Sequence, residues 1–380
     1  MQKIMLVFGT RPEAIKMCPL VKELKTREGI QTLVCVTGQH RQMLNQVLEA
    51  FSVTPDYDLS VMKDRQTLFD VTANILLKIR EVLEKEKPDV VLVHGDTSTT
   101  FVTALACFYL QIPVGHVEAG LRTYDKYSPY PEEMNRRMVS AIADLHFCPT
   151  PSNRDNLARE GIEQGVFLTG NTVIDALQTT VVKDFHFSEG VLNDLDYVNR
   201  KVILVTCHRR ENYGTPMAHI MTALRRVADA FPDVELVYPV HLSPVVQEAA
   251  HQYLDGHPRI HLIAPLAVDE MHNLMARCHL VMTDSGGLQE EAPALGKPVL
   301  VLRRETERPE AVAAGTVQLA GTEEEPIFQM ASRLLTDLAA YAAMAHAANP
   351  YGDGRACGRI ADAIEYRFGL RAQPPAPFHP

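Results

Sequence analysis

The sequence predicts an α/β protein with two Rossmann-like, doubly wound parallel-sheet domains that face each other across a cleft. Its 380 residues exceed the usual size of a single α/β domain. Short runs that are apolar on both faces alternate with helical patterns, as buried parallel strands alternate with crossover helices. The alternation forms two successive series, so two sheets are expected.

The first series extends from the N-terminus to residue 148. Its apolar runs predict strands over residues 4–8, 32–37, 90–93, 113–117 and 145–148. The periodic patterns around these runs predict helices over residues 12–26, 42–50, 68–86, 97–110 and 131–143.

The second series begins at residue 202. It predicts strands over residues 202–206, 235–240, 260–263, 280–283, 298–302 and 317–319. It predicts helices over residues 216–231, 244–254, 269–277, 288–295, 323–335 and 339–345. Residues 183–200 are polar and irregular, which is typical of a linker. We expect an N-terminal domain over residues 1–170, a C-terminal domain over residues 171–354 and a disordered, Pro-rich tail over residues 371–380.

The composition limits the possible partners and locations. A formal net charge of −10 argues against nucleic acid or an anionic membrane as the main partner. No apolar run approaches the roughly 20 residues of a membrane helix, and the N-terminus does not resemble a secretory signal. The seven cysteines are scattered without zinc spacing, so we expect small buried side chains. These observations predict a cytoplasmic protein that holds no metal.

Polar and ionisable residues collect directly after the predicted strands, where open parallel sheets bind their ligands. In the first series they occupy residues 9–13, 95–99 and 118–122. In the second series they occupy residues 207–211, 241, 284–287 and 303–308. We therefore expect both sheets to contribute to one ligand site in the cleft.

Two of these segments fit an anion such as a diphosphate. Residues 284–287, DSGG, follow a strand and open a helix, where glycine lets backbone N–H groups approach a phosphate. Arg308 could balance the same charge. Arg11 and Lys16 lie near the start of a helix, where cations oppose the helix dipole and a bound anion would explain them. An ordinary β–α turn and solvated surface cations are the alternatives.

Two common nucleotide-binding fingerprints are absent from the sequence. No G-x-G-x-x-G follows the first strand, and no G-x-x-x-x-G-K-[ST] occurs anywhere. A nicotinamide dehydrogenase and a P-loop phosphotransferase are therefore disfavoured, and we expect no NAD.

Four side chains are candidates for acid–base chemistry. Asp96 leads into a Ser/Thr-rich helix start, where capping is its alternative role. Glu118 ends a strand, and no cap explains it. Glu132 lies in a first helical turn, where the helix dipole alone could account for it. His208 ends the first strand of the second series, inside the predicted cleft, although it could instead belong to a solvated charge cluster with its neighbours.

Eight segments, in order, resemble the non-hydrolysing bacterial UDP-N-acetylglucosamine 2-epimerases over about residues 3–365. They are FGTRPEAIKM, VHGDTSTT, GHVEAGLRT, YSPYPEEMNR, CHRREN, TDSGGLQEEAPALGKPVLVLR, TERPE and NPYGDG. The resemblance implies a glycosyltransferase B-type fold whose C-terminal helix, here about residues 355–370, returns to the first domain. It also implies a homodimer that supplies N-acetylmannosamine for surface polysaccharides.

The resemblance further implies roles for individual residues. The catalytic positions are Asp96, Glu118, Glu132 and His208. The substrate-binding positions are Arg11, Lys16, Asp96, Glu118, Arg136, His208, Ser285, Gly286, Gly287, Glu291 and Arg308, of which Glu291 matches the glutamate that usually holds the ribose. A second UDP-N-acetylglucosamine, bound as an activator, would contact Gln39, Gln42, Arg65, Gln66, Glu132, Arg209 and His241.

The predicted reaction is the reversible epimerisation of UDP-N-acetylglucosamine to UDP-N-acetylmannosamine. The hydrogen at C2 is not acidic, so UDP is expected to leave C1 as the proton is lost, giving a glycal to which UDP returns. This route needs a carboxylate base, a second proton donor and cations for the diphosphate, but neither a metal nor NAD. The alternatives are a hydrolysing 2-epimerase, a retaining glycosyltransferase of the same fold and a catalytically silent UDP-sugar sensor.

Overall fold

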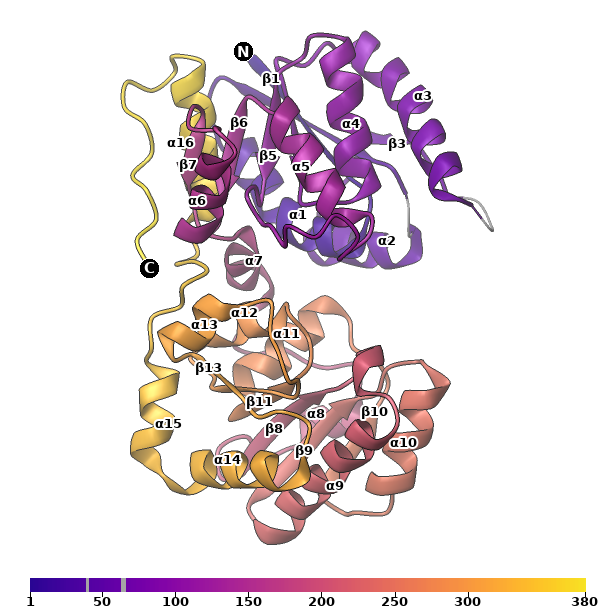
Figure 1. Cartoon of the computed structure of the whole chain (residues 1–380), viewed down its shortest axis with the longest axis vertical. Helices are drawn as coiled ribbons and strands as arrows, with labels where there is room; N and C mark the ends of the chain where they lie inside the picture. Colours follow the sequence, from indigo (N-terminus) through magenta and orange to yellow (C-terminus); the bar gives the residue numbers. More distant parts are fainter. Residues whose placement is uncertain (39–40, 63–65) are drawn as a thin grey trace. The chain divides into compact units, whose positions relative to one another are not determined.

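The protein, as a computed structural model, is described over residues 1–38, 41–62 and 66–380. It divides into two compact units, which Figure 1 shows in sequence colours. Unit 1 comprises Met1–Thr179 and Tyr351–Pro380, and unit 2 comprises Thr180–Pro350. The chain therefore leaves unit 1 once and returns to it once.

Unit 1 is built on a seven-stranded sheet in the order β3-β2-β1-β4-β5-β6-β7, with every pairing parallel. Its strands are β1 (Gln2–Phe8), β2 (Ile30–Val36), β3 (Tyr57–Asp58), β4 (Val90–His94), β5 (Val114–Val117), β6 (Leu145–Cys148) and β7 (Val166–Leu168). Its helices are α1 (Arg11–Lys25), α2 (Arg41–Ala50), α3 (Leu68–Glu86), α4 (Ser98–Tyr109), α5 (Glu132–Ile142), α6 (Pro151–Arg159), α7 (Thr172–Thr180) and α16 (Ala356–Arg367). The C-terminal α16 packs against α1 (Figure 1).

Unit 2 is built on a six-stranded sheet in the order β10-β9-β8-β11-β12-β13, again with parallel pairings. Its strands are β8 (Lys201–Thr206), β9 (Val234–Pro239), β10 (Ile260–Ile263), β11 (Leu280–Thr283), β12 (Val299–Val301) and β13 (Val317–Leu319). Its helices are α8 (Gly190–Asp194), the 3-10 turn η1 (Arg210–Asn212), α9 (Thr215–Ala230), α10 (Pro244–Leu254), α11 (Val268–Arg277), α12 (Leu288–Ala294), α13 (Pro309–Ala314), α14 (Glu324–Thr336) and α15 (Leu338–Ala345).

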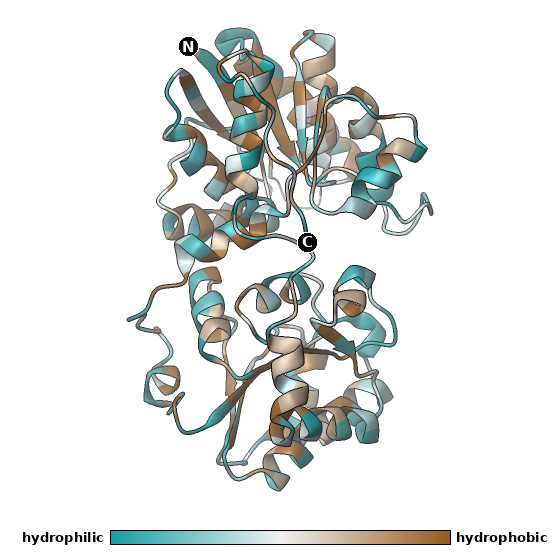
Figure 2. Ribbon diagram, turned by 90° about the vertical axis from the view of Figure 1, so that its left-hand side faces the viewer, coloured by the Kyte–Doolittle hydropathy of each residue, from teal (hydrophilic) through white to brown (hydrophobic). Residues whose placement is uncertain are grey.

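Each unit has its own hydrophobic core between its sheet and its helices. Every residue of β4 and β9 is buried, including the polar His94 and Glu235, as expected for parallel strands that are covered on both faces. Val91 and Ile75 belong to a core cluster of unit 1, and Leu224 and Tyr238 belong to one of unit 2. Figure 2 shows strongly hydrophobic colouring along the strands of both sheets.

The prediction of two doubly wound parallel-sheet domains is confirmed. The sequence patterns did not indicate the short β3 and β7, nor α6, α7, α8 and α13. The segment expected to be a linker, residues 183–200, contains α8 and belongs to unit 2. In the described part of the chain, no helix is long and apolar enough to cross a membrane.

The structure differs from the expected domain limits at both places where the chain passes between the two units. Unit 1 continues through α7 to Thr179 rather than ending at residue 170, and the chain re-enters it at Tyr351. The reason is that α7 is anchored in unit 1. Leu177 is buried, and the Asp175 carboxylate accepts the backbone N–H groups of Ala356 and Cys357 at 3.1 and 2.8 Å.

The tail over residues 371–380, expected to be disordered, is also anchored in the structure. Phe378 is buried, and its backbone N–H donates to the carbonyl of Leu168 at 2.8 Å. The Arg359 guanidinium lies 5.5 Å from the centre of the Phe378 ring, within reach of a cation–π contact. One aromatic anchor thus offsets the effect of the proline-rich composition around it.

The strand orders fix where a ligand site is expected. In each sheet the order reverses at one place, between β1 and β4 in unit 1 and between β8 and β11 in unit 2. Loops that follow such neighbours run to opposite faces of the sheet, which leaves a crevice at the carboxyl ends of the strands. The loops concerned follow Phe8, His94, Thr206 and Thr283, where the sequence already concentrates polar residues.

Candidate functional site

A buried carboxylate, Glu13, joins the two loops at the crevice of unit 1. It accepts the backbone N–H groups of Gly9 at 3.0 Å and Thr10 at 2.7 Å. Its other oxygen accepts the hydroxyls of Thr97 at 2.8 Å and Thr100 at 3.2 Å in the β4–α4 loop. Thr10 in turn caps α1 in a capping box with Glu13. Glu13 therefore fixes the start of α1 against the loop that carries Asp96.

Glu118, directly after β5, lies at the centre of an ion-pair cluster. Its Oε2 forms an ion pair with the Lys16 ammonium and accepts the side-chain amide of Asn171 at 3.1 Å. The Nε2 atom of His94 lies 3.6 Å from the same oxygen. Burial alone would raise the pKa of Glu118, but Lys16 and His94 hold it well below its usual range. The carboxylate is therefore ionised and fixed in place.

The backbone at Glu118 is also unusual. Its φ is 63°, in the left-handed region that a residue with a Cβ rarely occupies. Such conformations persist where the surrounding structure enforces them, and they concentrate at functional sites. The conformation supports the prediction that Glu118 is a site residue rather than an ordinary strand end.

Asp96, in the loop after β4, is held by Arg136 of α5. The Arg136 guanidinium forms an ion pair with Oδ2 of Asp96 and donates to Glu133 at 3.2 Å. The Asn135 side chain donates to the backbone carbonyl of Asp96 at 2.9 Å. Arg136 is thus committed to two carboxylates, whereas Oδ1 of Asp96 accepts no hydrogen bond from any residue that the structure describes.

Glu132 is the first residue of α5 and is half-buried. No residue in the described ranges pairs with its carboxylate, in contrast to its neighbour Glu133. The fully buried Glu133 accepts the backbone N–H groups of Thr123 at 3.0 Å and Tyr124 at 3.1 Å. Glu133 therefore shapes the loop before α5, and Glu132 keeps a carboxylate available.

Arg11 is the first residue of α1, and Lys16 lies one turn further along it. Lys16 reaches Glu118, so it is no freely solvated cation. Asp96, Glu118, Lys16 and Arg136 thus gather at the switch point of the sheet of unit 1.

In unit 2 a fully buried carboxylate, Asp284, joins the loop after β8 to the loop after β11, as Glu13 joins two loops in unit 1. Its Oδ2 accepts the backbone N–H groups of His208 and Arg209, both at 2.7 Å, and the Asn212 side chain at 3.2 Å. Its Oδ1 lies 3.2 Å from Nδ1 of His208. Burial alone would raise the pKa of Asp284, but His208 and these N–H groups lower it. Asp284 therefore fixes the β8 loop to the β11 loop and orients the imidazole.

The segment after Asp284 leads into α12. Gly287 is the residue before α12, and a Cβ there would lie 3.2 Å from Oε1 of Glu291. Oε2 of Glu291 lies 3.3 Å from Nε2 of the buried His272. Ser285 and Gly286 precede this turn, so the predicted phosphate and ribose positions adjoin in unit 2.

The arginines of the β12–α13 segment are already paired with acids. Arg308 forms an ion pair with Glu290 of α12. Glu307 receives the Arg303 guanidinium at 2.5 Å and lies 3.8 Å from that of Arg209. A diphosphate bound there would have to share these guanidinium groups with the acids.

The expected activator residues fall in both units. Gln66 and Glu132 lie in unit 1, and Arg209 and His241 lie in unit 2. The His241 ring stacks on His208, with centres 5.3 Å apart. Partial burial, with a contribution from the neighbouring His208, lowers the pKa of His241. Gln39 and Arg65 lie outside the described residues, and so does the side chain of Gln42.

All seven cysteines are free and buried, as their positions in apolar runs predicted. Burial raises the pKa of Cys18 and of Cys148 to about 12, so these thiols are unreactive near neutrality. Among the described residues, no three His, Cys, Asp or Glu side chains are grouped so as to hold a metal ion.

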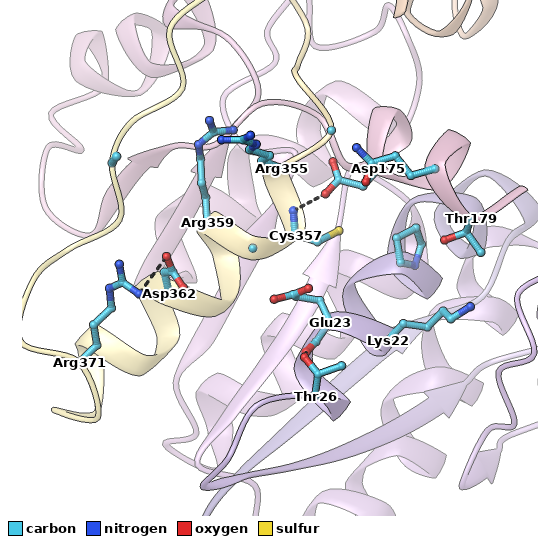
Figure 3. Close-up of a pocket in the computed structure, with 15 residues that line it drawn as sticks. Lys22, Glu23, Thr26, Asp175, Thr179, Arg355, Cys357, Arg359, Asp362 and Arg371 are labelled. Carbon is cyan, nitrogen blue, oxygen red and sulfur yellow. Dashed lines mark hydrogen bonds and ion pairs between the residues drawn. The ribbon is translucent and has the colours of Figure 1, made fainter. Parts of the chain in front are cut away.

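A pocket of about 590 Å³ opens on unit 1 among α1, α7 and α16 (Figure 3). Its polar walls are largely paired: Asp175 receives the amides at the start of α16, and Arg371 lies 3.1 Å from Asp362. None of the predicted site residues lines it. We interpret it as a hollow in the packing of the C-terminal helix α16 against α1 and α7.

Four residues that the sequence reasoning did not select as candidates hold the candidate residues of the two units in place: Glu13, His94 and Asn171 in unit 1, and Asp284 in unit 2. Glu13 and Asp284 stood inside recognised motifs, where a buried acid could have been suspected as a cap. His94 also stood inside a recognised motif, VHGDTSTT, but neither its contact with Glu118 nor that of Asn171 gave a signal, because these contacts join segments that are distant along the chain.

Comparison with known proteins matches these features to one family. A family model described as UDP-N-acetylglucosamine 2-epimerase matches residues 22–365. The UDP-N-acetylglucosamine 2-epimerase of Bacillus subtilis (strain 168) is 57% identical over 377 residues, covering 99% of this chain and 98% of the relative.

Two solved structures are similar over nearly the whole chain. One is a UDP-GlcNAc 2-epimerase from Neisseria meningitidis bound to UDP-GlcNAc, with a TM-score of 0.86 and 47% identity, covering 96% of this chain and 99% of that one. The other is the Methanocaldococcus jannaschii UDP-GlcNAc 2-epimerase in complex with UDP-GlcNAc and UDP, with a TM-score of 0.76 and 33% identity, covering 96% of this chain and 100% of that one.

Proposed function

Because the chain belongs to the UDP-N-acetylglucosamine 2-epimerase family, we propose that it interconverts UDP-N-acetylglucosamine and UDP-N-acetylmannosamine. The observation that carries the proposal is the cluster of Glu118, Asp96, Lys16 and Arg136 at the switch point of unit 1. The two similar structures described with bound UDP-GlcNAc support the substrate class.

We propose that the reaction proceeds by elimination and re-addition. No carbonyl adjoins C2 through carbon, so direct removal of its proton would be very slow. If the C1–O bond breaks as the C2 proton passes to a carboxylate, a C1=C2 double bond forms and UDP departs. Addition of UDP to C1, with a proton delivered to the opposite face of C2, gives the epimer.

The carboxylates of unit 1 fit the proton transfers. We assign the transfers to Asp96 and Glu132, because each keeps an oxygen without a partner among the described residues and neither has the Lys16 and His94 contacts that hold Glu118 ionised. Glu118 is ionised and anchored, which suits holding the sugar and stabilising positive charge that develops at C1. Arg136 would orient Asp96 rather than bind substrate directly.

Unit 2 fits the nucleotide. Glycine backbone at residues 286–287, Ser285 and the guanidinium of Arg308 are groups suited to a diphosphate. Glu291 would hold the ribose, and His208, oriented by Asp284, would donate to the leaving phosphate. No step in this scheme calls for a metal or NAD.

Activation by a second UDP-N-acetylglucosamine is also proposed. The stacked pair of His208 and His241 supports it, because a ligand that contacts His241 would act on the position of the neighbouring His208, the proposed phosphate donor. Assembly as a homodimer and a cytoplasmic location remain predictions from the sequence.

Proton NMR of the protein with UDP-N-acetylglucosamine in heavy water tests the proposed function. The expected result is conversion to UDP-N-acetylmannosamine with deuterium at C2 of both sugars, without added metal or NAD. Release of free N-acetylmannosamine would indicate a hydrolysing enzyme instead. Sugar transfer only with an acceptor would indicate a glycosyltransferase, and binding without isotope exchange would indicate a sensor.

A further inference from the structure

A buried histidine, His94, lies beside Glu118 at the C-terminal end of β4. It is 4% exposed, and its Nε2 is 3.6 Å from Oε2 of Glu118. Within the described ranges this nitrogen has no hydrogen-bond partner. A buried polar atom without a partner is costly and uncommon, so the position of the ring needs a physical reason.

The chemistry of the pair indicates which ring nitrogen carries the proton. A neutral imidazole has one donor and one acceptor nitrogen. If Nε2 were the acceptor, its lone pair would face a carboxylate oxygen and the two would repel. A proton on Nε2 makes the contact attractive, and an approach of about half an ångström would bring it into the usual range of an N–H···O hydrogen bond.

The described side chains that contact the Glu118 carboxylate all act on the same oxygen. Oε2 receives Lys16 from α1, Asn171 from the segment before α7 and His94 from β4. Oε1 accepts no hydrogen bond from the described residues and lies 3.9 Å from where a Cβ on Gly95 would be. One oxygen is therefore anchored on three sides, and the other is left for a ligand.

We propose that His94 is a positioning residue, whose Nε2–H holds Oε2 of Glu118 so that Oε1 stays presented to the sugar. The inference rests on the proposed function, in which Glu118 contacts the substrate. Lys16 is also expected to meet the diphosphate. If the anion draws Lys16 away from Glu118, His94 and Asn171 keep the carboxylate in its strained backbone position.

Three variants test this role. His94→Phe keeps a ring of similar size and removes the donor, whereas His94→Gln restores a neutral N–H donor. His146→Phe is the matched control, because His146 is another buried histidine of the same sheet, on β6, and does not contact Glu118. Each protein is first compared with the wild type in thermal unfolding and in UDP affinity.

The expected result is a selective loss in the chemical step. His94→Phe should lower kcat for deuterium exchange at C2 by up to about 100-fold, as misplacing a reacting group can, with KM changed less than about threefold. His94→Gln should recover most of this rate, and His146→Phe should match the wild type. His94→Phe should also move the acidic limb of the kcat profile to higher pH, because His94 helps to lower the pKa of Glu118.

Two kinetic outcomes would overturn the proposal: equal losses in His94→Phe and His146→Phe, or a His94→Gln protein as slow as His94→Phe. If His94→Phe does not fold, His94→Gln and nitrogen-15 NMR of the His94 ring in the wild type remain decisive. The ring should be protonated on Nε2, and an unprotonated Nε2 would contradict the role. A wild-type protein without exchange would refute the proposed function instead, while the ring spectrum would still test the hydrogen bond.

Discussion

The acids at the crevice of unit 1 differ in how fully they are paired. Both oxygens of Glu133 are paired, Glu118 has one oxygen held by Lys16, His94 and Asn171, Asp96 shares one oxygen with Arg136, and Glu132 has no described partner. A carboxylate that must take up or release a proton needs an accessible oxygen, whereas one that holds charge or shape does not. Asp96 and Glu132, which have an open oxygen and lack the lysine contact of Glu118, are therefore the proposed proton carriers.

Neutralising a proton carrier should slow the reaction without weakening nucleotide binding. We expect Asp96→Asn and Glu132→Gln each to lower the rate of C2 exchange by about 100-fold to 10,000-fold, the usual contribution of general acid–base catalysis. UDP affinity, measured by calorimetry, should change little, because neither acid is among the groups proposed to bind UDP. The exposed Glu81→Gln on α3 is the control. Exchange within about threefold of wild type in both acid variants would contradict the assignment.

Buried histidines should make the fold acid-sensitive. Burial lowers the pKa of His116 to about 3 and that of His146 to about 4. Both values lie below the unfolded value of about 6.5, so the unfolded chain takes up protons first as pH falls. Stability should be complete above about pH 6.5 and fall toward pH 4, by up to about 1.4 kcal/mol per pH unit for each ring.

Urea unfolding at a series of pH values measures this slope. The His146→Phe protein should show a shallower decline than the wild type, since one of the titrating rings is gone. A wild-type stability that stays constant from about pH 7 to 4 would show that these rings are not held neutral.

At the scale of elements, the loop after β5 depends on close packing of backbone against backbone. Gly120 has φ 90°, and a Cβ there would lie 2.1 Å from the carbonyl oxygen of Asn153. Gly161 has a similar φ of 78° but nothing within 4 Å of the added carbon. Replacing Gly161 therefore tests only the free-energy cost of a positive φ. Replacing Gly120 tests that cost together with the steric clash against Asn153.

Gly161→Ala should lower the free energy of unfolding by only about 1–2 kcal/mol, the cost of a left-handed alanine. Gly120→Ala should cost several kcal/mol, because the backbone of α6 must also move away. Chemical unfolding of both variants measures the difference. Equal losses would show that the loop after β5 is not packed as described.

The sequence predicted well those elements whose own residues carry the signal. Strands such as β1 and β12 contain continuous apolar runs, IMLVF and VLV, and helices such as α9 show a clear apolar face. The patterns did not indicate β7, which has three residues and so no period to detect. They also missed α7, whose sequence TVIDALQTT is rich in β-branched residues that disfavour helix and is stabilised by its contacts in unit 1.

The residues of the candidate site likewise divide into those with a local sequence signal and those whose role depends on contacts across the fold. Asp96, Glu118 and His208 could be selected because an ionisable residue at the end of an apolar run is recognisable from the sequence alone. His94 and Asn171 could not, because their role arises from contacts with Glu118 across the sheet. The anchoring role of Asp284 likewise depends on backbone amides far away in sequence.

At the scale of the whole molecule, unit 2 is a continuous segment, whereas unit 1 needs the C-terminal residues that return to it. A protein of residues 180–350 should therefore unfold cooperatively and bind UDP, but it should not exchange C2 protons. Arg308→Ala in this fragment should weaken UDP binding by about tenfold or more, as loss of a charge-assisted hydrogen bond does.

The control for that fragment is Arg304→Ala, which removes an exposed arginine of the same segment. Calorimetry with UDP compares the two. A folded fragment that does not bind UDP, or equal effects of the two substitutions, would contradict the assignment of the nucleotide to unit 2.

The central claim is that the bond between C1 and the diphosphate breaks during epimerisation. The most direct measurement uses UDP-N-acetylglucosamine with oxygen-18 in that bridging position, followed by phosphorus NMR as the epimers interconvert. If the bond breaks, the label should move from the bridge into the non-bridging oxygens of the β-phosphate, at a rate comparable to epimerisation. Complete epimerisation with all of the label still in the bridge would contradict it.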